Sequence, residues 1–137
     1  MTITTGQQAL INQIAAAPGR PTIGLPNGHV PEFSDTVTSR WVIQISGGSQ
    51  VGIGLDGATD ARPEIMVRVE TPADALAISN DTSVIQLCSL FPVGALVYAP
   101  GTVSTGVKID KAPQPKAPMP YAGVYSVPVI ITGRMFF

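Results

Sequence analysis

Residues Gly52 to Gly57 read GIGLDG and match the G-x-G-x-x-G pattern of dinucleotide-binding turns. In such a site the glycines let a strand turn tightly into a helix whose N-terminus faces a pyrophosphate. Here ATDARP follows the motif, and Pro63 is incompatible with the amphipathic helix that a phosphate site needs. A glycine-rich hairpin tip explains the motif better, so a small nucleotide-binding enzyme is the least favoured reading.

His29 is the only histidine and the other residue that could carry chemistry. A zinc site needs three or four ligands, and the only cysteine, Cys88, is distant in the sequence. No G-x-S-x-G motif supports a nucleophilic serine. We therefore expect no catalytic, metal or cofactor site and no enzyme activity. Two pairs of nearby carboxylates are better explained as solvated loop charges: Asp56 with Asp60, and Glu70 with Asp74.

Two helices are predicted from apolar residues at helical spacing. Thr5 with Gln8 fits a capping box, and the pattern runs from about Gly6 to Ala17, where Pro18 and Gly19 follow. The second helix is predicted from NDTSVIQLCSLFP, with Asn80 or Asp81 as its cap. Its apolar stripe is formed by Val84, Leu87, Cys88 and Phe91.

Strands are predicted where apolar and polar residues alternate. In RWVIQIS the inward residues are Trp41, Ile43 and Ile45. In EIMVRVETP they are Ile65, Val67 and Val69, with Met66, Arg68 and Glu70 outward. Between these strands, 47–60 is predicted to be a flexible hairpin tip.

The remaining segments divide into short strands and proline-rich connections. VGALVYAP and TVSTGVKI are predicted strands joined by a turn at Pro100-Gly101. The last predicted strand, in GVYSVPVIITGRMFF, should lie at a sheet edge or carry a bulge, because Pro128 has no backbone N–H to donate. Residues 18–39 hold four prolines and should run over the surface, and 111–121 is a proline-rich connector. The predicted fold is α+β: a single domain, 1–137, with a mainly antiparallel sheet of about five strands flanked by two short helices.

The surface is unusually poor in charge. Charged residues make up 12% of the chain, against roughly 25% in average soluble domains, and the net charge is -1. No apolar run approaches the roughly 18 residues of a spanning helix, and the N-terminus lacks the pattern of a signal peptide. A surface covered by copies of the chain or by partners explains the composition, and the near-neutral charge argues against a nucleic-acid binder.

The order of several motifs resembles the tail-terminator-like proteins of long-tailed (siphovirus-type) bacteriophages. The motifs are LPNGHVPEF before the aromatic-led strand RWVIQIS, a glycine-rich hairpin leading into IMVRVETP, a helix closing with LFPVG, and the late strand YSVPVIITG. The proline-dense KAPQPKAPMP departs from that pattern. The resemblance implies a structural virion protein of the neck, present in the host cytoplasm during assembly. It would form a homo-oligomeric ring, typically hexameric, that caps the tail tube and binds the head-tail connector (stopper) protein, while genomic DNA passes through the lumen without specific binding.

We interpret the 24–33 segment as a preformed docking loop, because its prolines reduce the entropy lost on binding. The 47–60 tip is expected to become ordered against a neighbour. The candidate interface residues are Asn27, His29 and Phe33 in the loop, and Gly52, Asp56 and Asp60 in the tip. A connector stopper whose hairpin narrows the channel, a tail-tube subunit and a capsid decoration protein stay open as alternatives.

Overall fold

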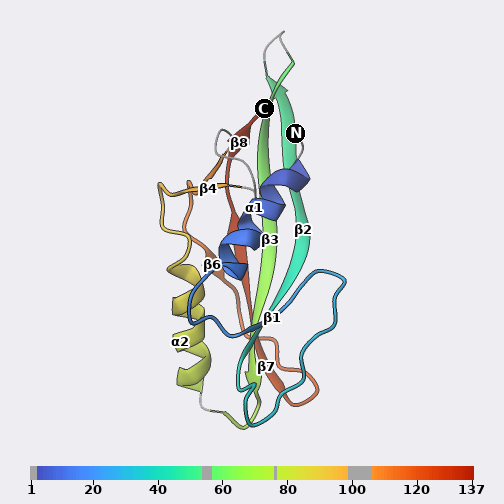
Figure 1. Cartoon of the computed structure of the whole chain (residues 1–137), viewed down its shortest axis with the longest axis vertical. Helices are drawn as coiled ribbons and strands as arrows, with labels where there is room; N and C mark the ends of the chain where they lie inside the picture. The colour runs from blue at the N-terminus through green and yellow to red at the C-terminus, as the bar shows by residue number, and fades with distance from the viewer. Residues whose placement is uncertain (1–2, 54–56, 76, 99–105) are drawn as a thin grey trace.

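The computed structural model describes residues 3–53, 57–75, 77–98 and 106–137. Its sheet has six strands in the order β1-β2-β3-β7-β6, with β8 also paired to β3, and a second sheet pairs β4 with β5. All pairings are antiparallel except that of β1 with β2. With two helices this confirms the α+β prediction (Figure 1). The strands are β1 (Thr22–Gly24), β2 (Arg40–Ile53), β3 (Ala58–Pro72), β4 (Leu96–Tyr98), β5 (Gly106–Lys108), β6 (Gln114–Pro115), β7 (Val124–Thr132) and β8 (Met135–Phe136).

Both helices, α1 (Ile3–Ala15) and α2 (Ala77–Cys88), pack on the same face of the sheet (Figure 1). This face is formed by the predicted inward residues of β3, which are all fully buried, and by Trp41 and Ile43 of β2. The Trp41 indole donates to Ser83 Oγ of α2 at 2.9 Å, which satisfies its only polar group. Alternation in two neighbouring strands therefore places the core as predicted.

The helix boundaries differ from the prediction. Helix α1 begins at Ile3, so Thr5 lies inside its first turn instead of capping it, and the helix ends at Ala15. Helix α2 begins at Ala77, so Asn80 is an interior residue and not the cap. The Asn80 amide is buried and donates to Val69 O at 3.0 Å, tying α2 to the sheet. Tertiary hydrogen bonding, not capping, explains this asparagine.

The described part of the 47–60 segment consists mainly of strand, and residues 54–56 lie outside the described residues. Strand β2 continues through it to Ile53, and a bulge between Ile45 and Gly47 shifts the register by one residue. From Gly47↔Glu64 to Ile53↔Ala58 every residue pairs with β3, which makes a long two-stranded arm at one end of the molecule (Figure 1). Ile45 lies before the bulge, directly opposite the buried Ile65, but is itself 49% exposed.

Several other strand predictions can be compared directly. Residues 22–24 of the segment predicted as surface loop form β1, paired parallel to Arg40–Val42. The strands β4 and β5 pair as predicted, while the turn at Pro100-Gly101 lies outside the described residues. Strand β7 is neither at an edge nor bulged against β3, because β6 and the segment after it cover its outer side. Pro128 O accepts a hydrogen bond from Lys116 N on that outer side. The position where Pro128 lacks an N–H also faces outward, so the ladder between β7 and β3 loses no hydrogen bond.

Two glycines in the arm give a matched test of its order. Gly48 has φ +117°, and a Cβ built on it would lie 2.2 Å from Arg62 O, whereas a Cβ on Gly52 would meet nothing within 4 Å. We expect Gly48→Ala to lower the free energy of unfolding by about 1–3 kcal/mol, because it adds backbone strain to a steric clash. Gly52→Ala should change it by less than about 1 kcal/mol. Chemical denaturation measures both, and equal effects would show that the arm is not held as described.

Candidate interaction surfaces

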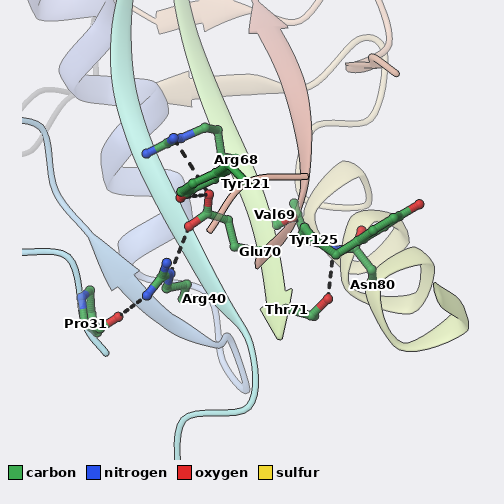
Figure 2. Close-up of polar contacts among 9 residues, drawn as sticks. All are labelled: Pro31, Arg40, Arg68, Val69, Glu70, Thr71, Asn80, Tyr121 and Tyr125. Carbon is green, nitrogen blue, oxygen red and sulfur yellow. Dashed lines mark hydrogen bonds and ion pairs between the residues drawn. The ribbon is translucent and has the colours of Figure 1, made fainter. Parts of the chain in front are cut away.

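A buried ion pair joins the ends of β2 and β3 on the sheet face opposite the helices. Arg40 and Glu70 are direct cross-strand partners, and Arg40 Nε lies 2.9 Å from Glu70 Oε1. The Tyr121 hydroxyl donates to Glu70 Oε2 at 2.6 Å, and Arg68 Nη1 lies 3.8 Å from the same oxygen (Figure 2). Glu70 is therefore not a solvated loop charge as predicted, but a fully buried carboxylate whose two oxygens are both paired.

Two irregular segments cover Glu70 from the outside. Arg40 Nη1 donates to Pro31 O at 2.6 Å, and the Arg40 guanidinium lies 4.2 Å from the centre of the Phe33 ring. Tyr121, at the end of the 111–121 connector, closes the other side (Figure 2). The Arg40–Glu70 ion pair, with the contacts of Arg40 to Pro31 and Phe33 and of Glu70 to Tyr121, is here called the Arg40–Glu70 latch. It holds both segments against the sheet.

The surroundings of Tyr121 raise the pKa of its phenol. Loss of solvent around it, and then its hydrogen bond to Glu70, raise the pKa of the phenol above its ordinary value. The group therefore remains a neutral donor to the carboxylate throughout the physiological pH range.

The 24–33 loop is built on a tight turn. Gly28 N donates to Leu25 O at 2.9 Å, and the turn has Pro26 in its second position and Asn27, with φ 58°, in its third. Proline fixes the first central φ and asparagine tolerates the positive one, so the sequence itself specifies the turn. Leu25, His29 and Val30 are exposed beside it. Of the predicted loop contacts, Asn27 shapes the turn, His29 is exposed, and Phe33 is half-buried against Arg40.

The predicted contacts of the arm lie at the other end of the molecule from the loop (Figure 1), so the structure does not bring the two groups together. Gly52 is exposed on β2, and Asp56 lies outside the described residues. Asp60 is held by Arg134, whose Nε and Nη2 lie 3.1 and 2.7 Å from its two carboxylate oxygens. The hydrogen bonds from Arg134 lower the pKa of the Asp60 carboxyl. Asp60 is therefore engaged within the chain.

Large apolar side chains are exposed at several places on the described surface. Ile78 and Ile85 lie seven residues apart on the outer side of α2, at 68% and 70% exposure. Others lie on the loop (Leu25), the arm (Val51), the turn between α2 and β4 (Val93), β4 (Leu96), the connector (Met119) and β8 (Phe136). Single exposed apolar residues are common on protein surfaces, whereas contiguous patches mark interaction sites.

The described residues that were considered for catalysis lie in different surroundings. His29 is exposed, Asp74 is exposed and apart from the buried Glu70, and burial raises the pKa of the half-buried Cys88 thiol. Within the described ranges, no cluster of three or more His, Cys, Asp or Glu could hold a metal ion. None of the described helices is long and apolar enough to cross a membrane.

Sequence reasoning missed the partners that position the loop and the arm: Arg40, Arg68, Tyr121 and Arg134. Arg40 and Glu70 stand at the start and near the end of two strands that were predicted as a hairpin. Their opposite charges would have indicated a cross-strand pair had the register been known. No local pattern relates Tyr121 or Arg134 to their distant partners.

Comparison with solved structures shows the same fold elsewhere at low identity. One chain, whose name describes no function, is 17% identical with a TM-score of 0.64, over 96% of this chain and 89% of its own length. Another belongs to the virion of a native gene transfer agent (GTA) particle; it is 12% identical with a TM-score of 0.61, over 98% of this chain and 96% of its own length. No protein-family model matches the sequence, and no curated protein does.

The latch can be tested by removing one partner. Arg40→Met should lower the free energy of unfolding by about 3–5 kcal/mol, because it leaves Glu70 buried without its cation. The matched control is Arg62→Met, which breaks the more exposed 2.9 Å pair with Asp110 and should cost less than about 1 kcal/mol. Urea denaturation measures both. Similar losses in the two variants would mean that the Arg40–Glu70 pair does not hold this end of the sheet.

Proposed function

We propose that the chain is a structural virion protein of the neck of a phage-like particle. Its copies form a ring, expected to be hexameric, that caps the tail tube and joins it to the head connector. The observation that carries the proposal is the likeness of the fold, over nearly the whole chain, to a component of the gene transfer agent virion. The tail-terminator-like order of sequence motifs supports the more specific role in the neck.

The surface of the chain supports an assembled state. A closed ring covers two different faces of each subunit, and stacking on a tube and a connector covers more. Permanent interfaces of this kind are more apolar than the rest of a protein surface. The exposed apolar residues and the low charge of this chain fit such a location. A net charge of -1 also suits a ring through which DNA passes without being held.

The 24–33 loop is the proposed docking element toward the tube or the connector. Its turn is specified by Pro26 and Asn27, and Arg40 holds its far end. Because the loop is ordered before binding, less conformational entropy is lost when it docks. Leu25, His29 and Val30 are then the contacts, while Phe33 acts through Arg40.

A connector stopper is the second candidate. The exposed two-stranded arm formed by β2 and β3 favours it, because a projecting hairpin can narrow a channel. A tail-tube subunit would instead use the arm to stack on further copies.

The assembly of the purified chain distinguishes these roles. We expect native mass spectrometry and electron microscopy, over a wide range of protein concentration, to find closed rings and nothing longer. Open filaments would favour the tube subunit. A chain that remains monomeric at every concentration would contradict the ring.

Docking through the loop predicts a specific defect. Leu25→Asp and Val30→Asp should leave the thermal stability of the subunit nearly unchanged, since both side chains are exposed, but block the joining of heads to tails. Particle titre and counts of unjoined heads and tails in micrographs measure this. Ile85→Asp on α2 is the matched control, and normal joining in both loop variants would show that the loop is not a docking element.

A further inference from the structure

The arm belongs to a continuous sheet that is larger than the strand pairs suggest. Strand β8 pairs with β3, and Arg134 and Lys108 exchange two backbone hydrogen bonds of 2.8 Å, which join this strand to β5. Strand β5 then pairs with β4. This end of the molecule therefore has the strand order β2-β3-β8-β5-β4, here called the distal sheet. Within the described ranges, no strand pairs with the outer side of β4 or with that of β2 beyond Val42; the two edges lie on opposite sides of the molecule (Figure 1).

The hydrogen bonds of β3 show which backbone groups of β2 point outward. Thr59 exchanges two bonds with Phe137, so its N–H and C=O face away from β2. By alternation Ala61 does the same. Their partners in β2, Gly52 and Gln50, are therefore in non-hydrogen-bonded pairs, and their N–H and C=O groups point out of the sheet edge.

The same reasoning applies at the opposite edge. The backbone N–H and C=O of Lys108 are hydrogen-bonded to Arg134, so both groups face away from β4. Its β4 partner, Leu96, is therefore in a non-hydrogen-bonded pair, and the N–H and C=O of Leu96 point out of the sheet edge. Tyr98, two residues later, does so too. The β2 edge thus presents Gly48, Gln50 and Gly52, and the β4 edge presents Leu96 and Tyr98 at the same two-residue spacing.

These two edges are not protected in the way that exposed strands usually are. No Asp, Glu, Lys or Arg occurs between Trp41 and Ile53 or in β4. The edge at β6 is different, because four prolines and two lysines lie between positions 111 and 120. Charges and prolines are the common means of preventing strand addition, so the chain blocks one edge and leaves the other two open.

We propose that the β2 edge of one copy pairs with the β4 edge of the next copy, so that the distal sheets of neighbouring subunits join. Four antiparallel pairings separate β2 from β4 within a copy, so the two strands run in the same direction. Copies related by rotation about an axis along the strands then pair them in parallel. Gln50 N–H donates to Leu96 O of the next copy, and Tyr98 N–H donates to Gln50 O.

The side chains beside these edges fit the same contact. Val51, Leu96 and Phe136 are 62%, 57% and 54% exposed, and an adjoining copy would cover apolar surface here. The contact is head-to-tail, since it uses two different edges, and therefore generates a closed ring or an open filament. This inference rests on the proposed ring and names the interface that builds it.

Proline variants test the two edges separately. Gln50→Pro removes the N–H that donates to Leu96 O but keeps the ladder to β3, whose bonds run through Ser49 and Val51. Tyr98→Pro removes the N–H that donates to Gln50 O but keeps the ladder to β5, whose bonds run through Val97. Gln50→Thr and Tyr98→Val keep the amides and are the matched controls. By native mass spectrometry we expect rings from the wild-type chain and both controls, and monomers from each proline variant with a wild-type melting temperature.

Mixing the two proline variants gives the decisive result. Each retains one intact edge, the β2 edge in Tyr98→Pro and the β4 edge in Gln50→Pro, so an equimolar mixture should form one-to-one dimers that cannot grow. Full-size rings from either proline variant, or a mixture that stays monomeric, would overturn the inference while leaving the ring itself intact. A wild-type chain that forms no ring would instead contradict the proposed function.

Amide exchange provides a second measurement that needs no substitution. In the free wild-type subunit the amides of Ser49 and Val51 should already be protected, and those of Gln50 and Gly52 should exchange fast. In the ring the Gln50 amide should become protected, because it is bonded to the neighbouring copy. Equal exchange of Gln50 in free and assembled protein would contradict the pairing even if the proline variants failed to fold.

Discussion

The Arg40–Glu70 pair is the constraint on which the loop end of the molecule depends. A carboxylate with no exposure to solvent is stable only when its charge is matched and its oxygens are bonded, and Arg40, Tyr121 and Arg68 meet this requirement together. Two of these partners also anchor irregular segments, since Arg40 reaches Pro31 and Tyr121 ends the connector. One buried charge thus ties the end of the 24–33 loop and the end of the 111–121 connector to the sheet.

The two ends of the molecule are stabilised by different means. At the loop end, a buried ion pair, the Asn80 amide and the Trp41–Ser83 bond link irregular segments and α2 to the sheet. At the arm, backbone ladders and the exposed Arg134–Asp60 pair provide the order, and few side chains cover the strands. The outer edge of the arm therefore has backbone groups without a strand partner within the described residues.

The sequence was sufficient for the fold class and for most of the core. Alternation placed Trp41, Ile43, Ile65, Val67 and Val69 correctly, because it depends only on the two-residue period of a strand. It failed at Glu70, where a polar residue on the outward face is buried by segments distant in sequence. It also missed the continuation of β2 through 47–53, where glycine content favoured a loop although these residues pair with β3. The candidate interface residues could be placed in a loop and an arm, but which of them are engaged internally, as Phe33 and Asp60 are, depends on tertiary contacts.

The position of the only tryptophan has a practical consequence. Trp41 follows Arg40 directly in β2, is completely buried, and donates to α2 through its indole. Its fluorescence therefore reports on the junction between the latch and the second helix without any label. A red shift of its emission would mark the entry of water at that junction, and it would do so against a dark background because the chain contains no second indole.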